Sequence, residues 1–89
     1  MMESRIQIGN RLGLHARAAA RFVHLANTFQ SKIVVSKDGS RVDGKSILGL
    51  LTLAASRGTQ LRLLAEGDDA EEALRQLTQL VHERFGEAE

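Results

Sequence analysis

The last quarter of the chain carries its strongest folding signal, a series of apolar residues that recur every three or four positions. The members of this series are Ala70, Ala73, Leu74, Leu77, Leu80, Val81 and Phe85. Such spacing gathers them on one face of a helix, and that face must be buried against another layer of structure. Asp68 precedes the series and Glu71 follows three residues later, which is the pattern of an N-terminal capping box.

Another helix, the first along the chain, is predicted from residue 16 to about residue 27. Its apolar series, again at spacings of three and four, consists of Ala16, Ala19, Ala20, Phe22, Val23, Ala26 and Phe29. Arg17, Arg21 and His24 fall on the opposite face of this helix, so we expect them to be exposed.

Short strands fill the remaining segments. We expect them over residues 5–9, 32–36, 41–43 and 59–65, which alternate in polarity or are rich in β-branched residues. Asp38-Gly39 forms a hairpin turn between the second and third strands, because this pair accepts the positive φ angles of a tight turn.

Ser46 is a favourable N-cap for a short helix over residues 47–53, in which Leu50 and Leu53 face the core. The resulting element order is βαββαβα. This order favours an α+β fold, an open-faced β-sandwich in which three helices cover one face of a four-stranded antiparallel sheet.

The composition excludes several classes of protein. A chain of 89 residues can bury one core, so we expect a single domain over residues 1–89. It contains no cysteine, which rules out a disulfide framework and a thiolate metal site. His15, His24 and His82 are too dispersed to share a metal ion, so no metal is expected. No signal peptide or membrane-spanning stretch is visible, and we expect a cytoplasmic protein.

The segment Asn10-Arg-Leu-Gly-Leu-His-Ala-Arg17 places His15 at the entrance of the first predicted helix. The first-turn N–H groups of a helix lack partners and carry partial positive charge, so the backbone of Ala16 and Arg17 can hold an anion. The Arg17 side chain adds a cation suited to phosphate oxygens. The same field favours the neutral, nucleophilic imidazole. These features indicate a phosphoryl carrier with His15 and Arg17 as catalytic residues, although a surface histidine that only caps the helix explains the spacing equally well.

Two further motifs favour the first interpretation. Together with Gly44-Lys-Ser-Ile-Leu-Gly49 and Ala54-Ala-Ser-Arg-Gly-Thr-Gln60, the histidine segment resembles the HPr family, the histidine-containing phosphocarriers of the bacterial phosphoenolpyruvate-dependent phosphotransferase system. The resemblance extends over roughly residues 3–85. It implies that His15 accepts a phosphoryl group on Nδ1 from enzyme I and passes it to an EIIA-type acceptor domain, for sugar uptake or regulation. Such a protein is a covalent intermediate more than a stand-alone enzyme, and it needs no cofactor.

The resemblance also implies roles outside the histidine segment. Ser46 matches the position that a dedicated serine kinase phosphorylates in some bacteria, although a helix cap explains this serine equally well. The short second helix cannot bury all of its apolar residues, and with the first helix it matches the surface that meets enzyme I and the acceptor domains. The predicted docking residues are Arg21, His24, Ile47, Leu48 and Leu51. We expect a monomer.

One position departs from the family pattern. Ala18 stands where proline usually follows the arginine, and because proline in a first helical turn chiefly restricts the unfolded chain, its loss should cost at most about 1 kcal/mol.

Three other readings of the sequence carry less weight or stay open. Residues 39–46 match the Walker A pattern, but they span a predicted turn and strand instead of a strand-to-helix loop, so nucleotide hydrolysis is not expected. A nitrogen-type regulatory paralogue of the same carrier shares all these motifs. A small RNA-binding module shares the βαββαβ order, but such modules stack bases on strand aromatics, and this chain has no Tyr or Trp. We expect neither nucleic-acid binding nor membrane insertion.

Overall fold

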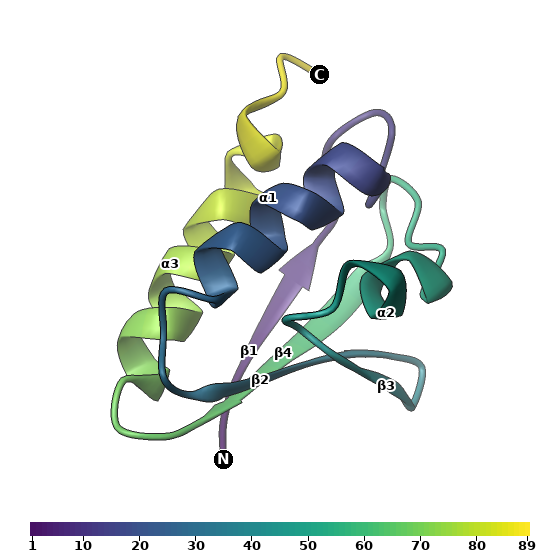
Figure 1. Ribbon diagram of the computed structural model, residues 1–89. Coiled ribbons are helices and arrows are strands. Elements are labelled where there is room, and N and C mark those ends of the chain that lie inside the picture. The colour runs from purple at the N-terminus through teal and green to yellow at the C-terminus, as the bar shows by residue number, and fades with distance from the viewer.

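The computed structural model describes residues 1–89, which form four strands and three α-helices in the order βαββαβα (Figure 1). The strands are β1 (Met2–Gln7), β2 (Lys32–Lys37), β3 (Ser40–Asp43) and β4 (Gln60–Glu66). The helices are α1 (Ala16–Ala26), α2 (Ile47–Thr52) and α3 (Ala70–His82), and a 3₁₀ turn, η1 (Arg84–Gly86), follows α3. The predicted element order is confirmed.

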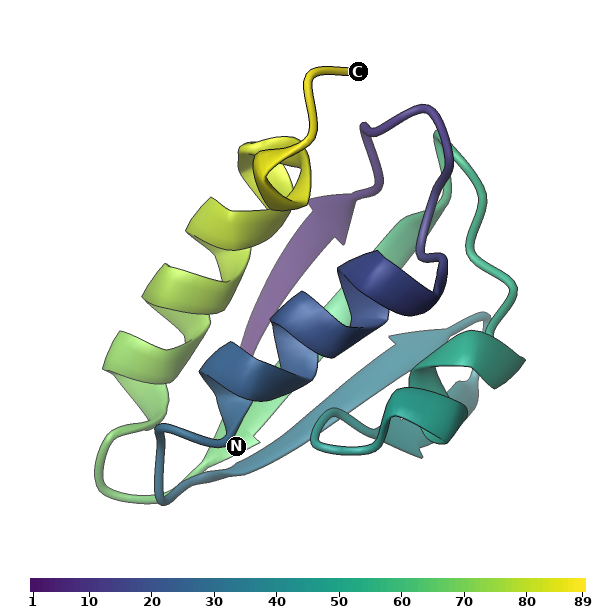
Figure 2. The same cartoon turned by 45° about the horizontal axis from the view of Figure 1, so that its top comes forward.

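The four strands form one antiparallel sheet in the order β1-β4-β2-β3. Ile6 pairs with Leu61 and Val35 pairs with Leu63, so these alternate residues of three strands point to the same face. All three helices cover that face (Figure 2). The chain is therefore the open-faced α+β sandwich that the element order predicted.

The core lies between the sheet and the helices. The predicted apolar face of α3 is buried, except that Leu80 is only half-buried. The predicted face of α1 needs a correction, because Ala16 and Ala20 are exposed while Ala18 is fully buried. Ala18 lies on the side of the helix that faces the sheet. Because alanine is small and occurs on both buried and exposed faces, its spacing does not define the buried face of a helix clearly. None of the helices combines the length and the apolar composition needed to span a membrane.

The strand boundaries differ from the predicted ones by a few residues. β1 begins at Met2 instead of residue 5, because residues 2–4 pair with Leu63–Ala65 of the central strand β4. It ends at Gln7, and Ile8 beyond it is buried with its backbone bonded to the loop before β4. β4 is shifted by one residue, and β2 and β3 each gain one residue at their shared turn.

The hairpin and the short helix follow the prediction. Asp38 and Gly39 have positive φ angles of 49° and 87°, as a tight turn between twisted strands requires. Ser46 caps α2, since its Oγ accepts a 3.0 Å hydrogen bond from the Gly49 amide. The buried leucines of this segment are Leu50 and Leu53.

The start of α3 differs from the prediction. Its N-cap is Asp69 instead of Asp68, and no side-chain capping bond forms. The Asp69 carboxylate instead accepts 2.9 Å hydrogen bonds from the backbone N–H groups of Gln30 and Ser31 and a further bond from the Ser31 hydroxyl. These bonds attach the start of α3 to the loop between α1 and β2.

The chain reverses direction after α3. The helix ends at His82, so Phe85 lies in η1 and not in the helix where its spacing had placed it. Arg84 and Phe85 both have left-handed backbone angles, with φ of 57° and 56°. Phe85 is nevertheless buried. The turn carries the last residues of the chain towards the start of α1 (Figure 1).

Candidate functional site

A tight loop delivers His15 to the start of α1. Gly13 has a φ of +70°, and a Cβ atom there would lie 2.6 Å from the carbonyl oxygen of Ala55, so a larger residue requires a shift of the backbone. Leu14 is buried, and its N–H donates a 2.8 Å hydrogen bond to that same carbonyl. The loop is thereby attached to the segment before β4, and His15 becomes the N-cap of α1.

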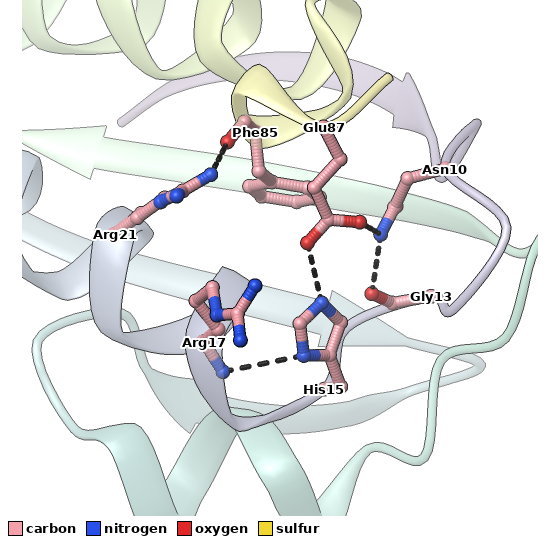
Figure 3. Close-up of polar contacts among 7 residues, drawn as sticks. All are labelled: Asn10, Gly13, His15, Arg17, Arg21, Phe85 and Glu87. Carbon is pink, nitrogen blue, oxygen red and sulfur yellow. Dashed lines mark hydrogen bonds and ion pairs between the residues drawn. The ribbon is translucent and has the colours of Figure 1, made fainter. Parts of the chain in front are cut away.

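The two ring nitrogens of His15 have different partners (Figure 3). Nδ1 faces the helix and accepts a 3.3 Å hydrogen bond from the backbone N–H of Arg17. Nε2 points the other way and lies 2.5 Å from Oε2 of Glu87. Because a backbone N–H can only donate, Nδ1 carries the lone pair and Nε2 carries the proton. The side chain keeps 26% of its accessible surface, so the ring is within reach of a partner protein.

Glu87 is fixed by a second bond. Its Oε1 accepts a 2.9 Å hydrogen bond from Nδ2 of Asn10, which also donates a 2.7 Å bond to the Gly13 carbonyl (Figure 3). The hydrogen bond from Asn10, followed by that from His15, lowers the pKa of Glu87 below its usual value, so the carboxylate is charged at neutral pH. Asn10 is fully buried. It therefore joins the loop that positions His15 to the C-terminal segment that contacts it.

Three arginines lie near Glu87, the carboxylate that contacts the histidine. Arg11, Arg17 and Arg21 line a surface pocket of about 310 Å³ together with the last residues of the chain. Arg21 donates a hydrogen bond to the Phe85 carbonyl (Figure 3), and Arg11 lies 3.3 Å from a carboxylate oxygen of Glu89. The guanidinium of Arg17 makes no ion pair or hydrogen bond within the chain and lies beside the imidazole. It is the cation that remains free to bind an anion at this site.

This arrangement suits the transfer of a phosphoryl group. A nitrogen with a free electron pair faces the positive end of a helix, where a first-turn N–H and an unpaired guanidinium can bind phosphoryl oxygens. No group of three or more His, Cys, Asp or Glu side chains is close enough to bind a metal.

The structure places the predicted site residues on two neighbouring helices. Arg17, Arg21 and His24 are exposed on α1, as predicted, and His24 lies two turns beyond Arg17 and outside the pocket. Ile47 and Leu48 are 40% and 76% exposed on α2, which packs against α1. Leu51 is half-buried against the core, so it contributes less surface than the prediction assumed.

Two residues of the site were missed by reasoning from sequence. Asn10 belongs to the histidine motif, but nothing in its spacing indicates that its side chain is buried. Glu87 lies 72 residues from His15 and looks like one charge in an acidic terminal segment. The one available signal was Gly86 just after the helical series, since glycine often follows the end of a helix.

Comparison with known proteins identifies relatives along the whole chain. Residues 2–83 match the family described as "PTS HPr component phosphorylation site". The phosphocarrier protein HPr of Neisseria meningitidis serogroup A is 49% identical over 89 residues, which cover 100% of both chains.

Solved structures show the same similarity. HPr-C-His from Thermoanaerobacter tengcongensis has a TM-score of 0.96 and 48% identity, with all of both chains covered. A crystal structure of an HPr dimer from the same organism has a TM-score of 0.79 and 49% identity and covers 98% of this chain and 100% of that one.

Proposed function

The chain belongs to the HPr family of phosphocarriers of the phosphotransferase system, and on this premise we propose that His15 is the residue that carries the phosphoryl group. The observation that supports this proposal most strongly is the orientation of its ring. Nδ1 holds its lone pair at the start of α1, where Arg17 supplies a backbone N–H and an unpaired side-chain cation. The RNA-binding alternative is not favoured by any of the relatives.

We propose that acceptance is an in-line transfer between two nitrogens. Nδ1 of His15 attacks the phosphorus of a phosphohistidine on enzyme I, and the donor's N–P bond breaks with its electron pair returning to the donor ring. The protein's contribution to such a transfer is positioning and charge stabilisation. The first-turn backbone of Ala16 and Arg17 and the Arg17 guanidinium supply both. The second transfer, to an EIIA-type acceptor domain, is the same step in the reverse direction.

The exposed surface of α1 and α2 is the proposed docking site for both partners. Ile47 and Leu48 are exposed apolar residues on α2, which packs against α1, the helix that carries the exposed basic residues Arg21 and His24. A surface that is apolar at its centre and basic at its edge fits partners with an apolar patch bordered by acidic residues.

Ser46 is the proposed site of regulatory phosphorylation. Its Oγ already accepts a hydrogen bond from the Gly49 amide, and a phosphate at that position is also an acceptor. Negative charge at the start of a helix is favourable. Phosphorylation is therefore compatible with the α2 cap, while it places negative charge on the docking surface and so repels an acidic partner.

We propose that the protein is a cytoplasmic monomer. Each residue of β1 pairs with β4 of the same chain, so no strand is left without its partner. The T. tengcongensis HPr dimer makes self-association the alternative. Size-exclusion chromatography with light scattering should give a mass near 9.7 kDa; twice that mass would identify a dimer.

The experiment that tests the proposed function is phosphorylation from phosphoenolpyruvate in the presence of Mg²⁺ and enzyme I. The wild-type protein should gain one acid-labile phosphate. His15→Ala should gain none and should keep its fold by circular dichroism. The control His82→Ala, which removes an exposed histidine beside the first residues of β1, should be phosphorylated normally. Acid-labile phosphorylation of His15→Ala would show that another residue is the carrier.

A further inference from the structure

The C-terminal segment brings a carboxylate to the side of the imidazole that faces away from the proposed reaction. Oε2 of Glu87 lies 2.5 Å from Nε2 of His15, and the Glu87 side chain retains only 15% of its accessible surface. Nδ1, on the opposite side, is the acceptor for the Arg17 amide. The carboxylate therefore contacts the ring nitrogen that does not receive the phosphoryl group.

The position of Glu87 is built by several independent contacts. Phe85 anchors the segment in the core at 1% exposure, and its carbonyl accepts a hydrogen bond from Arg21. The backbone N–H of Glu87 donates a 2.9 Å bond to the Arg84 carbonyl. The Asn10 amide then holds the second carboxylate oxygen. With both the backbone and the carboxylate held, Glu87 is a fixed partner for His15 and not a charge on a loose terminus.

We propose that Glu87 is a positioning residue for phosphoryl transfer, one that keeps the proton on Nε2 of His15 before and after Nδ1 is phosphorylated. This inference rests on the proposed role of His15 and adds to it. A carboxylate that accepts a hydrogen bond from an imidazole N–H fixes the ring and raises the basicity of the other nitrogen.

The electron balance shows why the proton matters. When Nδ1 forms its bond to phosphorus and Nε2 keeps its proton, the ring becomes a cation, which the negative charge of Glu87 stabilises. When the group moves on, the N–P bond breaks and its electron pair returns to Nδ1. The ring that leaves is then neutral imidazole. If Nε2 had lost its proton first, the leaving group would be the imidazolate anion, which leaves far less readily.

Other charged side chains near Glu87 also contribute to the electrostatic field at this site. Arg17 and Arg21 on α1 and Arg11 in the preceding loop are positive, and Glu89 at the end of the chain is paired with Arg11. α2 presents no charged side chain. Glu87 is the only carboxylate bonded to the imidazole. Its negative charge opposes the positive charge of these nearby arginines, which disfavours a protonated ring.

The test compares Glu87→Gln with the wild-type protein and with Glu89→Gln as a control. Glutamine retains the size of the side chain and loses its charge, and Glu89→Gln removes the same charge from the same segment without touching His15. All three proteins are phosphorylated chemically with phosphoramidate, so that loading does not depend on enzyme I. The ³¹P resonance of the phosphohistidine is then followed against pH, and phosphoryl transfer to an acceptor domain is timed from pH 6 to pH 9.

The pH dependence separates a role in holding the proton from a purely structural one. In Glu87→Gln the ³¹P titration should have its midpoint at lower pH than in the wild type and in Glu89→Gln. Transfer should be on the order of tenfold slower at pH 9 and should approach the wild-type rate at pH 6, because a higher proton concentration favours the protonated ring without help from the carboxylate. The inference would be overturned if the ³¹P titrations of Glu87→Gln and the wild type were superimposable. It would also be overturned if transfer in Glu87→Gln were slower by the same factor at every pH. In either case the loading of the wild-type protein on His15 is a separate result, and its failure would contradict the proposed function itself.

Discussion

Asn10 and Glu87 are separated by 77 residues and joined by a 2.9 Å hydrogen bond from Nδ2 to Oε1. The same nitrogen donates to the Gly13 carbonyl, so one buried amide holds both the histidine loop and the end of the chain. Asn10→Ala should lower the free energy of unfolding by about 1–3 kcal/mol, because it leaves buried polar groups without partners. Urea denaturation measures this value.

A matched control for that variant is Asn27→Ala. Asn27 is an exposed asparagine at the end of α1, so its replacement should change the unfolding free energy by no more than about 0.5 kcal/mol. Equal stabilities for the two variants would mean that the Asn10 amide does not hold the loop and the terminal segment together.

Arg17 should matter for transfer more than for folding. Its side chain is exposed and has no partner in the chain, so Arg17→Ala should unfold like the wild type while the rate of phosphoryl transfer falls by at least about tenfold. Rapid-quench assays of phosphoryl transfer from phosphorylated enzyme I measure this rate. Arg41→Ala, which removes one exposed positive charge from the distant strand β3, is the control; if it slowed transfer as much, Arg17 would be contributing only to overall charge.

Leu48 tests the docking surface. At 76% exposure it contributes little to the core, so Leu48→Glu should change stability by no more than about 0.5 kcal/mol. Transfer should slow by about tenfold, since a charge at the centre of an apolar contact must be desolvated without a partner. Leu50→Ala on the buried side of the same helix should instead lose about 2–5 kcal/mol of stability. A loss of unfolding free energy in Leu48→Glu as large as that in Leu50→Ala would assign Leu48 to the core.

Asp69 should make stability dependent on pH. The hydrogen bond from the Ser31 hydroxyl, followed by the bond from the Gln30 amide, lowers the pKa of Asp69 in the folded protein. The unfolded chain therefore binds this proton more readily. The stabilisation is present above the unfolded pKa of about 3.9 and is lost as the pH falls through the lower folded value.

Urea unfolding at several pH values measures this dependence. The wild type should be more stable than Asp69→Asn at pH 7, and the difference between them should shrink as the pH falls below about 4. Ser31→Ala, which removes the hydroxyl donor, should reproduce part of the effect. A difference between wild type and Asp69→Asn that stays constant from pH 7 to pH 2 would contradict this account.

Local patterns in the sequence were sufficient to predict the architecture. The spacing of Leu74, Leu77 and Val81 indicates one buried helical face, and Asp38-Gly39 indicates the turn between β2 and β3, because both signals act over a few residues. Apart from the alanines of α1, the errors in the fold lie at the ends of the elements. Asp69, and not Asp68, is the N-cap residue of α3, and its carboxylate bonds to Ser31 in another loop. An interaction over that separation leaves no periodic pattern in the sequence.

The site likewise contains residues whose position follows from the local sequence and one whose position does not. The position of His15 and Arg17 at the start of α1 can be predicted, because a helix entrance is a local property of the sequence. Their proposed catalytic role comes from that local charge and from the resemblance of the motif to a known family. Glu87 cannot be predicted by that route. It reaches His15 only through the left-handed backbone of Arg84 and Phe85, which periodicity alone reads as a continued helix.

The central claim is that Nδ1 of His15 carries the phosphoryl group. The most direct measurement is NMR spectroscopy of protein labelled with ¹⁵N in its histidine rings and phosphorylated by enzyme I and phosphoenolpyruvate. The account predicts a ³¹P–¹⁵N coupling to Nδ1 of His15, with Nε2 of the same ring still protonated. Coupling to Nε2 of His15, or a phosphoryl group on His24 or His82, would contradict it.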